Sequence, residues 1–158
     1  MPSTMSEPAD LSPTIIESLY GEALELADEV RAAFDLSGPL DLAGEDEDLA
    51  RIALSCEALR TTTRMMHAIA WLLNQRAFFA GELSEYQLRH HGRLPAGQPL
   101  SDEDQLAMLG PSLVEMFHRT ERFHARIERL DAAWRQRFAG QATPLDGLRN
   151  RIGSALGT

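Results

Sequence analysis

The chain has 158 residues, of which 44% are hydrophobic and 25% are charged, and its formal net charge is −9. This length suits one globular domain with its own core. The acidic balance argues against nucleic acid and against an anionic membrane surface as partners, because both are polyanions.

Cysteine content and the N-terminal residues indicate the compartment. Cys56 is the only cysteine, so no intrachain disulfide can form, and this fits a reducing environment. The first residues, MPSTMSEPAD, lack the basic and apolar regions of a signal peptide. No apolar run approaches the ~20 residues that span a bilayer. The sequence therefore predicts a cytoplasmic protein.

The first long helix is predicted to begin at residue 12. Residues 1–11 carry few apolar side chains, and we expect them to be flexible. Ser12 followed by Pro13 is a typical helix start, and Gly38 with Pro39 ends the helix. Between these points apolar residues alternate in steps of three and four, which predicts one buried stripe. The stripe consists of Ile16, Leu19, Ala23, Leu26, Val30 and Ala33.

The second long helix is predicted to begin at the four consecutive acids of residues 45–48. Acidic side chains are favoured there by the positive end of the helix dipole. We expect this helix to end at Gly81. Apolar positions again alternate in steps of three and four, and we expect this stripe to face the core. It consists of Leu49, Ile52, Cys56, Leu59, Thr63, Met66, Ala70 and Leu73.

A short helix and a third long helix complete the pattern. Ser84 and Gln87 form a capping box for a helix over residues 84–91, before a loop rich in glycine and proline. The third long helix covers residues 102–138, with a kink or brief break expected at Gly110–Pro111. Its stripe consists of Leu106, Leu109, Leu113, Met116, Thr120, Phe123, Ile127, Leu130 and Trp134.

These elements predict an all-α fold. No segment has the pattern of a strand, and three long helices with matching stripes indicate an antiparallel three-helix bundle over residues 12–138. Residues 139–158 form a C-terminal tail, in which Gly147 and Gly153 weaken any helix. The tail is either a marginal helix that orders on a partner or, as we prefer, a docked or frayed end. Its apolar residues on roughly one face are Leu145, Leu148, Ile152 and Leu156.

One side of the second helix combines aromatic and basic residues. Trp71 and Phe78 lie more than about 90° from the centre of the apolar stripe. Aromatic side chains among arginines are typical of interface hot spots. We expect a partner or dimer interface here, although the segment 84–91 or the tail could instead cover the two rings. The expected contact residues are Arg60, Arg64, Trp71, Gln75 and Phe78.

Two E-x-x-H pairs raise the alternative of a metal enzyme. Glu115 with His118, and Glu121 with His124, have the spacing found in carboxylate metalloproteins with four-helix bundles. Six residues turn a helix by about 240° net, so the two pairs point to different sides and cannot share a site. We therefore expect no metal, no cofactor and no catalytic activity. The alternative is a metal-dependent helical-bundle enzyme that uses one E-x-x-H pair.

Arginines follow one flank of the third helix, and glutamates follow one flank of the first. We favour the hypothesis that the two rows face one another and fix the pairing of the helices. The alternative is that the arginines bind an acidic protein partner. The arginines are Arg119, Arg122, Arg126 and Arg129, and the glutamates are Glu22, Glu25 and Glu29.

The second helix resembles the signature of a small bacterial family named for the regulator of CtrA degradation. The similar elements are the run LRTTTRMM, the triplets WLL and QRA that follow it, and the turn GELS. The later segment MFHRTERFHARIERLD is compatible with the last helix of that family, so the resemblance covers about residues 48–131. The matching residues of the family core are Arg64, Trp71, Leu72, Gln75 and Arg76.

This resemblance implies a non-enzymatic three-helix bundle that forms a homodimer. Members of the family, most of which are described as a domain of unknown function, act as adaptors in cell-cycle control. They bring cargo to the ClpXP protease together with response-regulator-like partners. The resemblance thus implies an unfoldase, a regulator and a cargo protein as partners of this chain.

Overall fold

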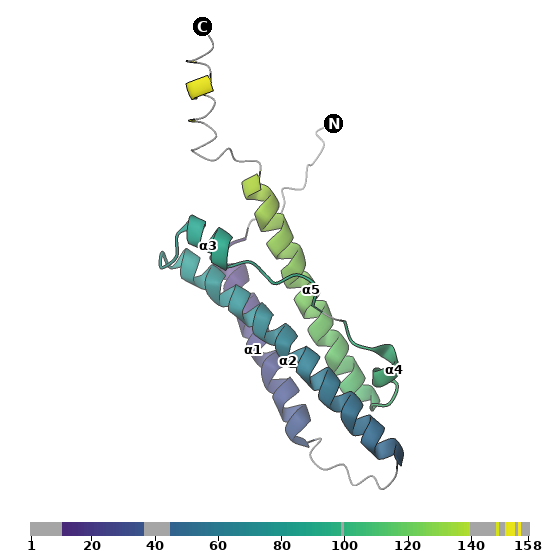
Figure 1. Cartoon of the computed structure of the whole chain (residues 1–158). Coiled ribbons are helices and arrows are strands. Elements are labelled where there is room, and N and C mark those ends of the chain that lie inside the picture. Colours follow the sequence, from purple (N-terminus) through teal and green to yellow (C-terminus); the bar gives the residue numbers. More distant parts are fainter. Residues whose placement is uncertain are drawn as a thin grey trace, which may run out of the picture.

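The computed structural model describes residues 11–36, 45–98 and 100–139, together with residues 148, 151–153 and 155 of the tail. Most of the described residues are helical and none of them forms a strand, which confirms the all-α fold class. Three long helices pack together (Figure 1). The helices are α1 (Pro13–Leu36), α2 (Glu45–Phe79), α3 (Glu85–His91), α4 (Glu103–Leu106) and α5 (Pro111–Ala139).

The direction of α5 differs from the antiparallel arrangement expected for neighbours in the bundle. Arg64 of α2 bonds to Thr120, and Trp71 further along α2 bonds to Asp131, so α2 and α5 run in the same direction. The reason is the segment between them, which returns along the bundle before α5 begins (Figure 1). Helix α1 is antiparallel to both α2 and α5.

The helix ends follow the local signals of the sequence. Gly81 adopts φ +79°, a left-handed conformation that suits glycine, directly after α2. Ser84 and Gln87 form the expected capping box of α3, which ends at His91 with Gly92 as its C-cap. The expected break at Gly110 is present, and it separates the single turn of α4 from α5.

The predicted stripes of α1 and α5 form the core. All of their residues are buried or half-buried, and Ile16, Ala23 and Ile127 are fully inaccessible. A second cluster near the other end of the bundle gathers around Phe117, whose ring lies 6.1 Å from that of Phe34. Burial of these apolar surfaces is the main force that holds the three helices together.

Helix α2 is rotated relative to our expectation. Leu59 is 70% exposed and Met66 is 64% exposed, whereas the adjacent Met65 is only 4% exposed. The prediction that the stripe of this helix faces the core is therefore wrong. We call its residues the α2 stripe: Leu49, Ile52, Cys56, Leu59, Thr63, Met66, Ala70 and Leu73. The buried side of the helix carries Ala53, Glu57, Thr61, Arg64, Met65, Ala68, Trp71, Leu72 and Gln75.

The two ends of the chain are described only in part. Leu11 packs against the core, and the remaining residues of the N-terminus expected to be flexible lie outside the described residues. In the tail, Leu148 and Ile152 are helical and exposed, while Leu145 and Leu156 lie outside the described residues. Among the helices described, none combines the length and the hydropathy needed to cross a bilayer.

Candidate functional site

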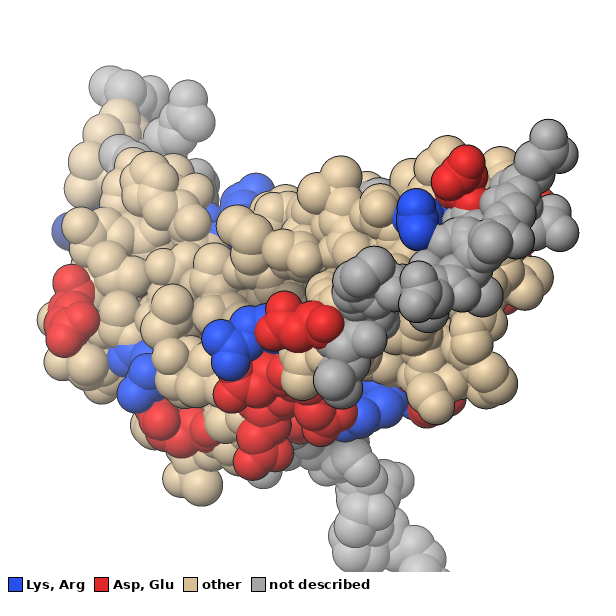
Figure 2. Space-filling view, turned by 90° about the horizontal axis from the view of Figure 1, so that it is seen from below, with Lys and Arg blue, Asp and Glu red and all other residues tan. Residues whose placement is uncertain are grey.

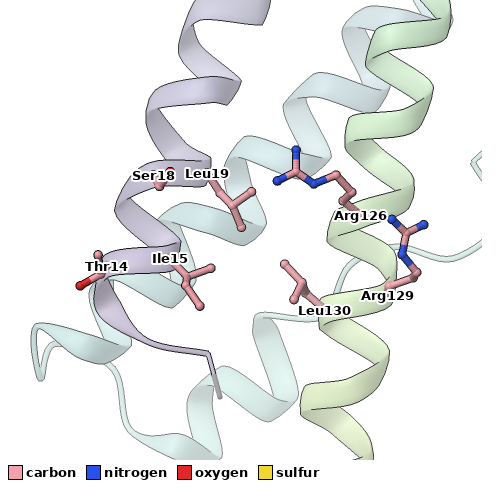
Figure 3. A pocket seen from close by; sticks show the side chains of 7 residues that line it. All are labelled: Thr14, Ile15, Ser18, Leu19, Arg126, Arg129 and Leu130. Carbon is pink, nitrogen blue, oxygen red and sulfur yellow. The ribbon is translucent and has the colours of Figure 1, made fainter. Parts of the chain in front are cut away.

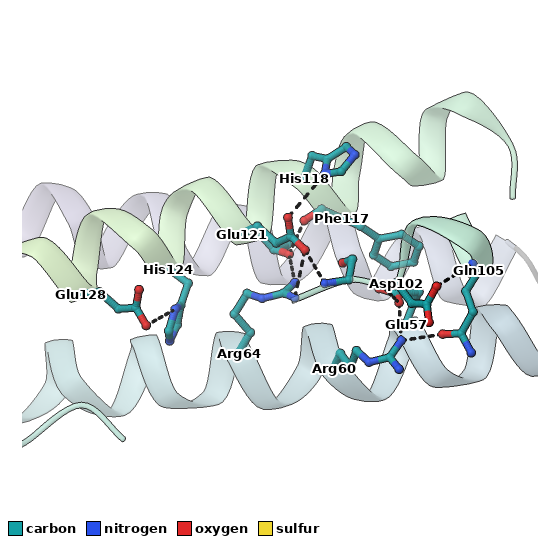
Figure 4. A network of polar contacts seen from close by, with 12 residues as sticks. Glu57, Arg60, Arg64, Asp102, Gln105, Phe117, His118, Glu121, His124 and Glu128 are labelled. Carbon is teal, nitrogen blue, oxygen red and sulfur yellow. Dashed lines mark hydrogen bonds and ion pairs between the residues drawn. The ribbon is translucent and has the colours of Figure 1, made fainter. Parts of the chain in front are cut away.

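A buried arginine lies at the centre of a polar layer between α2 and α5 (Figure 4). Arg64 is 2% exposed, and its Nη1 donates to Oγ1 of Thr120 at 2.8 Å. Its Nη2 lies 3.5 Å from Oε1 of Glu121. Burial lowers the pKa of Arg64, and the carboxylates of Glu121 and Glu57 oppose this shift. The guanidinium is thus a buried cation that is compensated inside the chain.

Glu121 connects this arginine to the segment that precedes α4. The backbone N–H of Ser101 donates to Oε1 of Glu121 at 2.7 Å, and His118 Nδ1 lies 3.4 Å from its other oxygen. Partial burial alone would raise the pKa of Glu121, but the hydrogen bonds from Ser101 and the nearby Arg64 outweigh it and lower the pKa. The carboxylate is therefore ionised at neutral pH and holds the segment against the bundle.

A second carboxylate fixes the start of α4 in the same way. Glu57 is fully buried, and its Oε1 accepts a hydrogen bond of 3.0 Å from the backbone N–H of Asp102. Arg60 binds both Glu57 and the side-chain oxygen of Gln105, the latter at 2.6 Å. The bonds from Glu57 to Asp102 and from Arg60 to Gln105 join α2 to the start of α4, so this end of the layer holds the returning segment in place.

These bonds leave the E-x-x-H pairs engaged with other groups. Oε1 of Glu115 accepts from Arg122 at 2.7 Å, His118 faces Glu121, and His124 Nδ1 lies 3.6 Å from Glu128. Within the described part of the chain, no group of three potential metal-ligating side chains comes together. The layer has the composition of a structural polar core, in which Arg64, Glu121, Glu57 and Arg60 each bond to a partner on a neighbouring helix or segment.

The residues expected on an outward contact face are mainly internal. Arg64, Trp71 and Gln75 are at most 2% exposed, and Arg60 and Phe78 are half-buried. Their predicted place on an exposed face is wrong, because α2 turns this side toward α5 and α4. Polar residues on a helix face normally indicate solvent, but here Arg60, Arg64 and Trp71 bond to residues of α4 and α5.

The arginine row of α5 is largely paired inside the chain. Arg119 bonds to Glu29, and Arg126 bonds to Glu22 at 2.9 Å, which confirms for these two pairs that the rows of α1 and α5 face one another. Arg122 bonds to Glu115 of its own helix. Arg129 is exposed, and none of the described side chains forms an ion pair with it.

The surface that sequence reasoning assigned to the core is the α2 stripe. A groove of about 300 Å³ between α1 and α2 borders it, lined mainly by apolar side chains that include Phe34, Met66 and Ile69. The end of the bundle where α1 ends and α2 begins gathers acidic side chains in one patch, while uncharged residues cover much of the rest (Figure 2). The residues of the α2 stripe alternate in steps of three and four, which is the heptad pattern of a coiled coil. This spacing is the sequence feature that indicates a contact surface on α2.

Comparison with known proteins gives a family and no function. A family model described as "Protein of unknown function (DUF1465)" matches residues 8–156, which is nearly the whole chain. No curated protein and no solved structure shows a significant match.

Proposed function

The chain belongs to this family of proteins of unknown function, and we propose that it acts as a non-enzymatic cytoplasmic adaptor that forms a homodimer along the α2 stripe. The resemblance of α2 to the regulator of CtrA degradation supports a role in regulated proteolysis during the cell cycle. In that role the dimer brings a cargo protein to the ClpXP protease in cooperation with a response-regulator-like partner.

The exposed α2 stripe is the observation that carries this proposal. Five large apolar side chains lie on one side of a 35-residue helix, and each is between 44% and 70% exposed. They are Leu49, Ile52, Leu59, Met66 and Leu73. Monomeric proteins rarely expose a continuous apolar surface of this length. A heptad stripe of this kind is buried when a second helix packs its own apolar residues between those of the first.

A second copy of the chain fits this surface in size. Paired along about 36 Å of helix, two stripes would bury on the order of 1,000 Å², which is the lower range for a specific interface. The apolar groove beside Met66 gives room for side chains of the second copy at the flank of the stripe.

The distribution of charge and size favours an antiparallel pair. In a parallel pair, the carboxylates of Asp48 in the two copies would lie close together and repel. In an antiparallel pair centred between Leu59 and Thr63, the two Asp48 side chains lie at opposite ends of the interface. The same register places Ile52 opposite Ala70 and Leu59 opposite Thr63, so at these two positions a large side chain meets a smaller one.

Cysteine cross-linking tests this register. In the antiparallel pair, position 66 lies opposite Cys56 of the second copy, so the variant Met66→Cys should form a covalent dimer on oxidation. The variant Cys56→Ser/Met66→Cys should not, because position 66 then faces a serine. The two positions are too far apart along one helix for an intrachain bridge. Cross-linking of Cys56 in the wild-type chain, or of the double variant, would instead indicate a parallel pair.

Mass measurement in solution tests the dimer itself. Light scattering should give the mass of two chains for the wild type and of one chain for Leu59→Glu/Met66→Glu, with unchanged helical content by circular dichroism. Tyr86→Glu is the matched control, since Tyr86 is an equally exposed ring on α3 and the variant should remain dimeric. A wild-type chain that is monomeric at every concentration contradicts the proposed pairing.

Co-purification tests the adaptor role separately. A tagged chain purified from native lysate should recover the unfoldase subunit of ClpXP together with a response-regulator-like protein. Recovery of neither from a lysate in which the tagged chain is dimeric contradicts the adaptor role and leaves the pairing intact. Stoichiometric iron, manganese or zinc in the purified protein would favour the metal enzyme instead.

A further inference from the structure

A groove lies between the first turns of α1 and the second half of α5 (Figure 3). Its cavity volume is about 540 Å³. Ile15 and Leu19 of α1 point toward Leu130 of α5, so the interior of the groove is apolar (Figure 3). The hydroxyl residues Thr14 and Ser18 and the guanidinium groups of Arg126 and Arg129 complete its lining.

The ion pairs between α1 and α5 stop at the edge of this groove. Arg119 with Glu29 and Arg126 with Glu22 are two pairs that lie one heptad apart. Beyond Glu22, α1 offers Leu19, Ser18 and Ile15 toward α5 in place of a carboxylate. Arg129 is thus an exposed cation next to an apolar groove, and the carboxylate that would continue the row is absent from α1.

The start of α1 adds a second preference for negative charge. Thr14 lies in the first turn of this 24-residue helix, where the helix dipole and backbone N–H groups favour an anion. Ser12 already satisfies the N–H of Ile15, so the remaining attraction acts mainly at the rim near Thr14.

We propose that this groove binds a short peptide of another protein in which a carboxylate stands next to an aliphatic side chain. The carboxylate pairs with Arg129, and the aliphatic side chain covers Ile15, Leu19 and Leu130. A peptide fits better than a compact small molecule because the groove runs between two helices and is lined from two sides only. None of the lining residues belongs to α2, so this site holds whether or not the chain pairs along the α2 stripe.

Two matched peptides test the proposal on the full chain. The first is a fluorescein-labelled, C-terminally amidated peptide ALLEA, and the second is ALLQA, which differs only in charge. We expect ALLEA to bind about tenfold more tightly, as is typical for a hydrogen bond to a charged group. The amide signals of Ile15, Ser18 and Leu130 should shift in nitrogen-15 NMR spectra when ALLEA is added.

Two arginine variants locate the contact. Arg129→Gln should remove the difference between the peptides, while Arg122→Gln, one heptad earlier on the same helix, should retain it. Circular dichroism checks that both variants keep their helical content. Equal binding of the two peptides, an unchanged preference in Arg129→Gln, or no binding of either peptide overturns the proposal. Binding of decanoate without binding of ALLEA also overturns it, since the site would then take a free amphipathic acid.

Discussion

The indole N–H of Trp71 donates a hydrogen bond of 3.0 Å to Oδ1 of Asp131, and both residues are only 2% exposed. Arg135 lies 2.6 Å from the other carboxylate oxygen of Asp131. The indole thus joins α2 to the last part of α5 inside the bundle. The same bond fixes the parallel direction of the two helices, together with the contact of Arg64 with Thr120.

Replacing this indole should destabilise the fold. Trp71→Phe removes the donor, leaves an oxygen of the buried Asp131 without its bond and opens a small cavity. We expect a loss of about 1–3 kcal/mol in the free energy of unfolding, measured by urea denaturation. The control is Tyr86→Phe, which removes a polar group from an exposed ring and should leave the free energy of unfolding unchanged. Equal midpoints for Trp71→Phe and the wild type would show that the bond contributes nothing.

The helices and two of the three core faces could be predicted from the sequence. Helices α1 and α5 each have one apolar face, so the stripe that contains Leu19 and the stripe that contains Phe123 could only face inward. The cap of α3 and the break before α5 are local features, and Ser84 and Gly110 mark them in the sequence. Periodicity is sufficient where one face is apolar and the other is polar.

The orientation of α2 could not be predicted in this way because both of its sides carry apolar residues. Met66 continues a perfect heptad spacing, and Met65 lies beside the polar residues Glu57 and Arg64. Only the partners of those polar residues on α5 and on the segment before α4 show that they are buried. Each of these hydrogen bonds joins residues that are far apart in the sequence, so the spacing of apolar residues along one helix cannot reveal it. The candidate contact surface was therefore assigned to the wrong side.

The buried arginine gives a second prediction. Arg64→Ala removes the buried cation that faces Glu121, whereas Glu57 keeps its ion pair with Arg60, and we expect a loss of about 3 kcal/mol in the free energy of unfolding. The matched control is Arg122→Ala, because Arg122 pairs with Glu115 on the surface of the same bundle and should contribute little. Chemical denaturation of both variants at pH 7 makes the comparison. A similar small effect for the two substitutions would contradict a structural role for the polar layer.

The turn after α2 gives a third prediction, which concerns the backbone alone. A Cβ added at Gly81 would meet no atom within 4 Å, so space does not limit this position. Its φ of +79° is nevertheless unfavourable for any residue with a side chain. Gly81→Ala should therefore lower the free energy of unfolding by about 1 kcal/mol. Gly21→Ala, inside α1 with equally open space, should instead raise it slightly, because alanine favours the helix. Thermal unfolding of both variants should give shifts of opposite sign.

His124 should make stability depend on pH near neutrality. It is 4% exposed, and burial lowers its pKa below the ordinary 6.5, helped by Arg64 and His67 and opposed by Glu128. Between the lowered pKa and 6.5, the unfolded chain binds a proton that the folded chain does not, so the contribution of this group is full above pH 6.5 and decreases as the pH falls.

The expected measurement is a free energy of unfolding that declines between pH 7.5 and pH 5.5, by at most about 1.4 kcal/mol per pH unit from this one group. His124→Gln removes the titrating ring and should flatten the decline, whatever its effect on stability at pH 7.5. Ionised Glu121 also stabilises the fold more at higher pH, but over a separate pH range. Because its pKa is lowered, its contribution to stability is lost only as the pH falls below the ordinary pKa of a glutamate. Urea titrations of Glu121→Gln should therefore keep the slope near pH 6.5 and lose part of the decline below pH 4.5. If the slope near pH 6.5 were the same with and without the imidazole at position 124, the buried ring would not be its source.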